Sequence, residues 1–229
     1  MSDNLYQAPE ADIEREEKAT ISLPEELNPW KTIWLKPRLT YRYLLANNPE
    51  YMVILLAMLA GIHSALDRAS GRSSGDDLSL GAIIGSALVG GVIGGIITLF
   101  LGSWLVKVAG SWLGGRANTV QIRLVYAWAS VPGVVGLAAL VLSIVLFGKD
   151  MFTTYTPTIS ANMINTSLFW GFTLIQLVFS IWSIALYIIG VAEVHEFSKW
   201  RAFFSIVIAV LLIMVPIVSI AFLVILGTH

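Results

Sequence analysis

The chain has 229 residues, of which 56% are apolar and 13% are charged, whereas soluble domains carry about 25% charged residues. A soluble fold of this composition would lack the polar surface that water requires, so a membrane protein is predicted. The net charge of −1 gives no sign of a nucleic-acid partner, and the absence of cysteine excludes disulfides, thiolate metal sites and cysteine nucleophiles.

The first 29 residues are polar, acidic and interrupted by three prolines. They contain too few large apolar groups to offset the entropy of ordering. We expect residues 1–29 to form a disordered cytoplasmic tail without a cleavable signal, followed by one membrane domain over residues 30–229.

Residues 30–47 predict a segment that lies in the membrane interface. Trp30, Ile33, Trp34 and Pro37 recur at helical spacing, and basic residues lie between them. Proline fits poorly inside a helix, so we expect two short helices, with the proline in the first turn of the second. The interfacial or lipid-binding residues predicted in this segment are Trp30, Lys31, Trp34, Lys36, Arg38 and Arg42.

Five apolar stretches follow, and each is predicted to form a transmembrane helix. The expected fold class is therefore all-α, a polytopic bundle of five membrane helices preceded by interfacial helices. The first stretch is short and must extend through polar residues, including His63 and Asp67, or lie where the bilayer thins. The expected spans are residues 51–66, 80–106, 124–147, 167–192 and 202–226.

The basic residues predict the orientation of these spans. Of the 14 Lys and Arg residues, 11 lie in the amino-terminal region and in the second-to-third and fourth-to-fifth connections. The other connections carry three. Because basic loops stay in the cytoplasm, we expect a multi-pass protein of the cell (inner) membrane with a cytoplasmic amino terminus and a periplasmic or extracellular carboxyl terminus.

Two segments resemble a known family. The run NPWKTIWLKPRLTYRYLLANNPEYMVILLAMLAGI is similar to the opening of bacterial members of the Yip-one (Ypt-interacting protein) domain family, with an IWxxPR segment before the first span. The run SWLGGRANTVQIRLVYAWASVPGV is similar to the family's glycine-rich loop and its entry to the third helix. The resemblance covers roughly residues 28–226 and leaves the acidic tail outside.

This resemblance carries expectations about function. For eukaryotic relatives it implies Rab-type GTPase binding through the cytosolic face, mutual association, and roles in vesicle traffic and membrane shape. For bacterial relatives it implies residence in the inner membrane.

Small residues four apart fill the second predicted span. They allow close approach of helix backbones in lipid, where apolar burial gives no net drive for association. Packing within the chain is the favoured interpretation, and a homodimer interface is the alternative. The helix-packing residues predicted are Gly85, Gly90, Gly91, Gly94 and Gly95.

Two prolines fall within predicted spans, Pro132 in the third and Pro216 in the fifth. Each removes a backbone donor and frees a carbonyl, so each is a candidate hinge. A simple kink between close neighbours is the alternative, and the sequence favours it.

Ionisable residues gather in the turn before the last span, where Glu193, His195 and Glu196 form a candidate ion, proton or partner site. A solvated turn with local ion pairs to Lys199 and Arg201 is the alternative. The spacing matches no zinc motif, and we expect no metal and no cofactor. At the same boundary, a basic aromatic rim that attracts anionic lipid is predicted from Arg116, Arg123, Lys107, Trp112 and Trp128.

No catalytic constellation can be assembled from these residues, so the chain is not expected to be an enzyme. The first hypothesis is a non-enzymatic membrane organiser or adaptor that binds membrane lipids or a cytoplasmic protein partner through its cytoplasmic face. The alternative is a small homo-oligomeric transporter or channel that uses the prolines and the ionisable turn.

Overall fold

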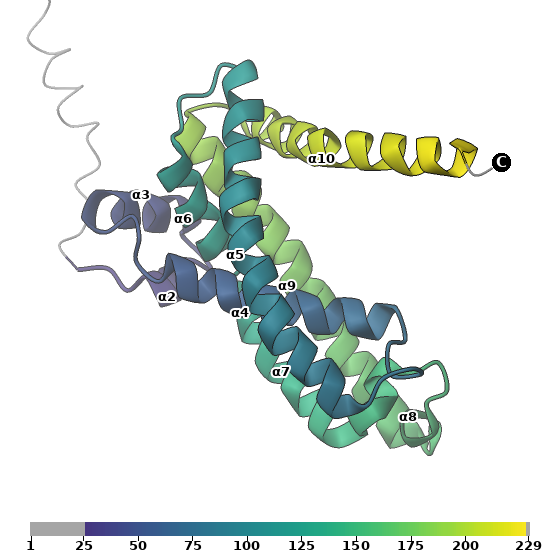
Figure 1. Ribbon diagram of the computed structural model, residues 1–229. Helices are drawn as coiled ribbons and strands as arrows, with labels where there is room; N and C mark the ends of the chain where they lie inside the picture. Colours follow the sequence, from purple (N-terminus) through teal and green to yellow (C-terminus); the bar gives the residue numbers. More distant parts are fainter. Residues whose placement is uncertain (1–25, 228–229) are drawn as a thin grey trace, which may run out of the picture.

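The computed structural model describes the backbone of residues 26–227 and the side chains of residues 26–220. This described part is helical and contains no strand (Figure 1). Most of the predicted disordered tail lies outside it, but Asn28 caps the first described helix, which begins at Pro29. The elements are α2 (Pro29–Thr32), α3 (Pro37–Asn47), α4 (Val53–Gly71), α5 (Leu80–Trp112), α6 (Thr119–Ala129), α7 (Val131–Phe147), the 3-10 helix η1 (Gly148–Phe152), α8 (Pro157–Ser160), α9 (Met163–His195) and α10 (Lys199–Gly227).

Five stretches in the described part are long and apolar enough to cross a membrane, which confirms the predicted fold class. The helices extend beyond the predicted apolar stretches. Both α5 and α9 have 33 residues, about 50 Å at 1.5 Å per residue, which exceeds a hydrocarbon core of about 30 Å. Hydropathy marks only the part of a helix that lies in lipid, because polar residues continue the helix outside it.

The third span consists of two helices, α6 and α7, separated at Ser130. Pro132 lies in the first turn of α7, where its missing N–H would have no helical partner. The start of α6 is fixed by a capping box, in which the Asn118 side chain accepts from the Gln121 N–H and the Gln121 side chain accepts from the Asn118 N–H. The predicted interruption therefore falls between two well-formed helices.

The closest helix pair, α4 and α5, meets over glycine. A Cβ atom on Gly61 would lie 2.0 Å from the carbonyl oxygen of Gly91, and one on Gly95 would lie 2.2 Å from that of Ala57. A Cβ on Gly85, Gly90 or Gly94 would meet nothing within 4 Å. The predicted glycine set is thus divided, with Gly91 and Gly95 packing inside the chain and the other three facing away from it.

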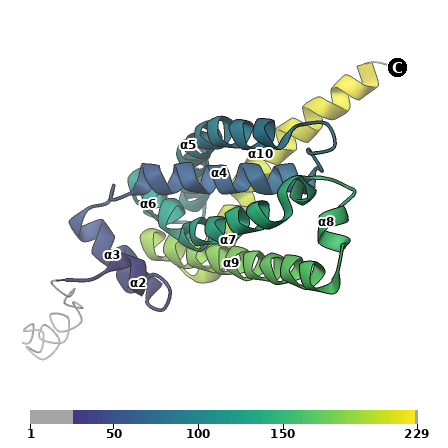
Figure 2. The ribbon, with the colours of Figure 1, turned by 90° about the horizontal axis from the view of Figure 1, so that it is seen from below.

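The last helix, α10, leaves the bundle. Ala202, Ser205 and Ala209 pack against the other helices, but every residue from 210 to 220 is exposed within the chain. Figures 1 and 2 both show α10 projecting away as a separate arm. Pro216 lies inside this arm, so the predicted hinge position has no neighbouring helix among the residues that the structure describes.

The helices α2 and α3 form what we call the platform, residues 29–47, at one end of the bundle (Figure 2). They are separate helices with Pro37 in the first turn of α3, which confirms the predicted pair. The Thr32 and Thr40 hydroxyls join them with a 2.8 Å hydrogen bond. We call this end of the bundle, which also carries the connections 113–118 and 196–198, the basic end.

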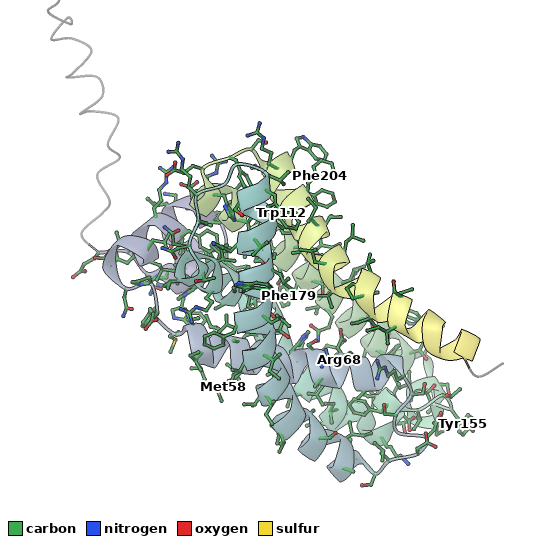
Figure 3. The ribbon with its side chains drawn as sticks, turned by 45° about the horizontal axis from the view of Figure 1, so that its top comes forward. Met58, Arg68, Trp112, Tyr155, Phe179 and Phe204 are labelled. Carbon is green, nitrogen blue, oxygen red and sulfur yellow. The ribbon has the colours of Figure 1, made fainter. Side chains whose placement is uncertain are left out.

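The opposite end is closed by contacts between the α4–α5 connection and the segment after α7. The Asp76 carboxylate accepts from the Thr154 N–H at 3.0 Å and from its hydroxyl at 2.6 Å, and the Gly75 N–H donates to the Phe152 carbonyl. These hydrogen bonds lower the pKa of Asp76, with the side-chain bond contributing most. Figure 3 shows Tyr155 at this end and Trp112 with Phe204 at the basic end.

Candidate functional site

The platform is seated on α9 through Tyr41. The buried Tyr41 hydroxyl donates to the Leu186 carbonyl at 3.2 Å. Its ring lies against Gly190, where a Cβ atom would be only 2.9 Å from two ring carbons. Burial raises the pKa of Tyr41, and the nearby Tyr187 raises it further, so the hydroxyl remains a donor. Leu186 and Gly190 are four residues apart on one face of α9, and this face is the seat of α3.

One turn further along the same face, Glu193 joins two arginines of the platform. The Arg42 guanidinium donates from Nε to Glu193 Oε1, and Arg38 Nε lies 3.7 Å from Oε2. The Glu193 side chain is 14% exposed, and the arginine side chains are about half exposed. A largely shielded carboxylate between two cations attaches α3 to α9 more firmly than a single exposed ion pair would.

His195 turns away from Glu193 and is buried in a slot between glycines. Cβ atoms on Gly110 and Gly115 would lie 2.3 Å and 2.1 Å from its ring. The Ala117 N–H donates to its Nδ1 at 3.3 Å, and Phe197 stacks on the ring at 4.8 Å between centroids. The imidazole therefore joins the end of α5 and the following connection to the end of α9.

Glu196 lies outside this slot. It is exposed and its carboxylate lies 3.8 Å from the Arg116 guanidinium. The three ionisable residues of the turn thus point to different surroundings, and no group of His, Cys, Asp and Glu suited to a metal occurs in the part of the chain that the structure describes. The acids pair with Arg38, Arg42 and Arg116 rather than with the expected Lys199 and Arg201.

Two of the predicted interfacial aromatics contact aromatic rings of the bundle, whereas Trp112 is 64% exposed. Trp30 lies 5.2 Å from Trp128 between ring centroids, and Trp34 lies 6.0 Å from Phe179. The predicted rim is wrong for Trp128, which is fully buried and donates from its indole to the Tyr51 carbonyl at 3.1 Å. Its indole N–H has a protein partner and therefore needs no contact with the headgroup layer.

Cations and one apolar side chain remain exposed on the platform. A shallow groove of about 450 Å³ runs where the α2–α3 connection meets the start of α10, and we call it the platform groove. Leu35 is 88% exposed at its edge, and Lys31 is exposed on α2. The groove is lined by Leu35, Lys36, Pro37, Arg38, Leu39, Ile189 and Lys199.

Polar groups also lie inside the bundle. His63 Nε2 and both amide atoms of Gln176 are buried without a hydrogen-bond partner among the described residues. The Gln176 amide lies against α7, where a Cβ atom on Gly136 would be 2.4 Å from the amide oxygen. A Cβ atom on Gly133 would be 4.0 Å from His63 Nδ1. Both side chains therefore face adjacent turns of α7.

Sequence reasoning did not find the seat on α9. Tyr41 precedes Gly190 and Glu193 by some 150 residues, and only the pairing of α3 with α9 brings it to them. A signal was present in the spacing of Leu186, Gly190 and Glu193, which lie at i, i+4 and i+7 on a helix. It becomes informative only when the partner helix is known.

The family of the chain follows from comparison with known proteins. The family model described as the Yip1 domain matches residues 31–220, most of the chain. The match is to the family as a whole and does not assign the chain to its bacterial members. No curated protein and no solved structure gives a significant match. The resemblance noted in the sequence is thereby confirmed, and the chain, a multi-pass membrane protein, belongs to the Yip1 domain family.

Proposed function

We propose that this protein is a non-enzymatic organiser or adaptor of the cell inner membrane, which binds anionic lipid or an acidic partner protein through a cytoplasmic basic face. The observation that carries the proposal is the platform itself, which is joined to α9 by Tyr41 and Glu193 while Lys36, Lys199 and Leu35 stay exposed. This surface presents Lys36 and Lys199, which take part in no ion pair within residues 26–220.

Elementary energetics support a role in binding. Each basic residue near an anionic membrane surface contributes about 1 kcal/mol of attraction. An exposed leucine between cations adds an apolar contact, either with the acyl boundary or with a partner. Arg38 and Arg42 are partly neutralised by Glu193, so Lys36 and Lys199 carry most of the free charge at the platform groove.

The test uses the full chain in native membranes, because Ile33 and Tyr41 belong to the core and deletion of the platform would disturb it. The variant Lys36→Glu/Lys199→Glu is compared with Lys149→Glu/Arg72→Glu at the opposite end. We expect the groove variant to lose crosslinked partners or copurifying anionic lipid, and the control to retain them. Equal recovery of both from the two variants would contradict the proposal.

The orientation is tested separately by single-cysteine labelling, which the absence of native cysteine makes unambiguous. In intact cells, an impermeant maleimide is expected to label Lys149→Cys and to leave Lys36→Cys unlabelled until the membrane is opened. Labelling of Lys36→Cys from outside would reverse the proposed topology.

A second candidate, a homo-oligomeric transporter or channel, is favoured by the unpartnered His63 and Gln176 inside the bundle. Buried polar groups in a membrane protein are candidates for an ion or solute path. Ion flux into liposomes is compared for the native chain, for His63→Leu and Gln176→Leu, and for Glu193→Gln and His195→Ala. Absence of flux, or flux unaffected by all four changes, would remove this candidate.

A further inference from the structure

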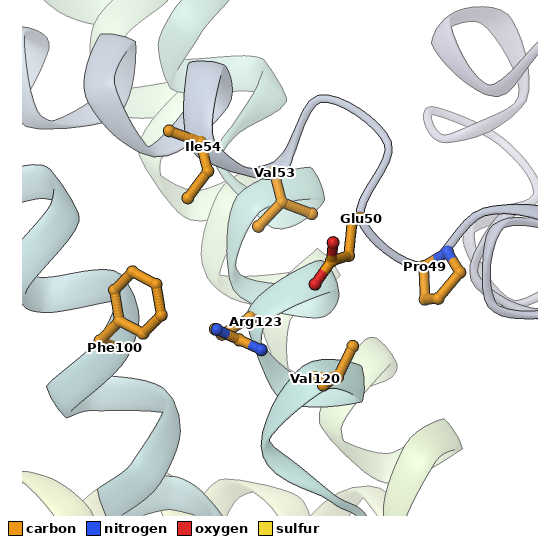
Figure 4. Close-up of a pocket in the computed structure, with 7 residues that line it drawn as sticks. All are labelled: Pro49, Glu50, Val53, Ile54, Phe100, Val120 and Arg123. Atoms are coloured by element: carbon orange, nitrogen blue, oxygen red, sulfur yellow. The ribbon is translucent and has the colours of Figure 1, made fainter.

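A separate pocket lies between the α3–α4 connection, the first turn of α4, the middle of α5 and the first turn of α6. It encloses about 270 Å³ and is lined by both charged and apolar side chains. In Figure 4 the Glu50 carboxylate extends into it, and the Arg123 guanidinium lies between Phe100 and Val120. The lining residues are Pro49, Glu50, Val53, Ile54, Phe100, Val120 and Arg123.

The two charged side chains of this pocket form no ion pair with another described residue. Within residues 26–220 the ion pairs are those of Glu193 and Glu196, and neither Glu50 nor Arg123 takes part in one. Arg123 is held by the face of Phe100, with its guanidinium carbon 4.8 Å from the ring centroid. The pocket therefore presents one anion and one oriented cation, too far apart to form an ion pair with each other.

An apolar track leads away from the charges. Phe100 and Ile54 line the pocket and are 46% and 45% exposed. Ile97 and Ile93 follow Phe100 at one and two turns along the same face of α5, and both are exposed. Lys107, two turns beyond Phe100 in the other direction, is the first charged residue after the apolar stretch of α5. The pocket thus lies near the boundary between hydrocarbon and headgroups, and the track runs toward the hydrocarbon.

We propose that this pocket binds the headgroup of an aminophospholipid, a membrane lipid that carries both a phosphodiester and a primary ammonium. Arg123 binds the phosphate, Glu50 binds the ammonium, and an acyl chain lies along Ile54, Phe100 and Ile97. The inference rests on the lipid-binding role proposed above and names the lipid class for a second, distinct surface.

The chemistry of the two charges selects this class over other lipids. A guanidinium donates paired hydrogen bonds to phosphate oxygens, and a carboxylate accepts hydrogen bonds from a primary ammonium. A choline headgroup has no N–H to donate, so it satisfies Glu50 less well. A glycerol headgroup carries no positive charge and leaves Glu50 beside a lipid anion without compensation.

The test measures lipid retention by the full chain. Protein is reconstituted in nanodiscs that contain phosphatidylethanolamine, phosphatidylcholine and phosphatidylglycerol in equal parts, released gently and analysed by native mass spectrometry. We expect phosphatidylethanolamine to be retained about fivefold over each of the others, equivalent to about 1 kcal/mol. Equal retention of the three lipids would overturn the proposal, and so would preferential retention of phosphatidylglycerol, which would indicate a simple anion site.

Single substitutions test whether the lipid preference comes from this pocket. Glu50→Gln is expected to abolish the preference for phosphatidylethanolamine, and Arg123→Gln to lower retention of all three lipids. Val120→Phe fills the pocket while both charges remain, so it keeps the test valid if Arg123→Gln does not fold. The matched controls Asp77→Asn and Lys149→Gln each remove an exposed charge at the opposite end of the bundle and are expected to behave as the native chain. Native retention in the three pocket variants would refute the assignment.

Two further experiments distinguish a bound lipid from a soluble headgroup, and this pocket from the platform groove. Soluble glycerophosphoethanolamine at millimolar concentration is expected to leave the bound lipid in place, because the apolar track contributes to binding; full displacement would refute the proposed lipid source. The platform-groove variant Lys36→Glu/Lys199→Glu is expected to keep its preference for phosphatidylethanolamine. Loss of partners or anionic lipid in that variant alone therefore reports on the proposed function, whereas loss of preference in Glu50→Gln alone reports on this pocket.

Discussion

Substitution of Gly61 by alanine tests whether α4 and α5 really meet over glycine. The added Cβ would lie 2.0 Å from the carbonyl oxygen of Gly91, whereas ordinary contact begins at 3.4 Å, so the helices must separate locally by about 1.4 Å. Overpacking of this kind destabilises by about 1–3 kcal/mol, and the higher helix propensity of alanine returns about 0.5–1 kcal/mol. The clash is between backbone atoms, which cannot move aside as a side chain could, so we expect the upper part of this range, a net loss of about 1–2.5 kcal/mol.

The matched control is Gly90→Ala, at an exposed position of α5 next to Gly91, where an added Cβ meets nothing within 4 Å. It is expected to leave stability unchanged or to raise it by up to about 1 kcal/mol through helix propensity. Both variants are compared by reversible unfolding in mixed micelles of increasing SDS fraction, followed by far-ultraviolet circular dichroism. Equal effects of the two substitutions, or a native midpoint for Gly61→Ala, would refute the reasoning.

The other predictions concern the two ends of the bundle. Tyr41→Phe removes a buried hydrogen bond and is expected to cost about 1 kcal/mol in the same unfolding assay; an unchanged midpoint would argue against the bond. Arg42→Glu should speed hydrogen exchange in α3, and Arg42→Glu/Glu193→Arg should slow it again; failure of the double variant to recover would show that the pairing does not hold the platform. His195→Ala leaves a void between two glycines and an unpaired Ala117 N–H, so a loss of about 2–4 kcal/mol is expected, and a native melting temperature would contradict this. Because the pKa of Asp76 is lowered in the folded protein, the contribution of this carboxylate to stability is present above the ordinary carboxyl pKa and is lost as the pH falls through the folded-state pKa. Hydrogen exchange at the Thr154 N–H should therefore rise in that acid range. The Asp76→Asn variant should remove this pH dependence.

Much of the fold could be predicted because lipid imposes strong local rules. Long uncharged stretches must become helices, so the five spans follow from hydropathy alone. Proline fixes its own backbone angle, so the division of the platform at Pro37 and the break near Pro132 are also local properties. These features need no knowledge of which helix neighbours which.

The candidate site could not be predicted in the same way, because hydropathy gives the length of a membrane helix but not which face meets a partner. Gly90 and Gly91 are adjacent in sequence, yet only Gly91 packs against α4. Glu193 and His195 are two residues apart, yet one faces the arginines of α3 and the other enters a glycine slot. The projection of α10 is likewise a property of packing, since residues 210–220 carry no charge and are exposed within the chain all the same.

The seat of the platform has a consequence for the order in which the protein is made. Tyr41 leaves the ribosome 145 residues before Leu186, the residue whose carbonyl it will bind. At about 5–20 residues per second, this separation corresponds to about 7–30 s of synthesis. During that interval the part of α3 that packs on α9 has no α9 surface to cover it, so it must rest on the bilayer, on the earlier helices or on the insertion machinery. A nascent chain stalled before α9 would therefore keep its platform undocked, however completely its first spans had been inserted.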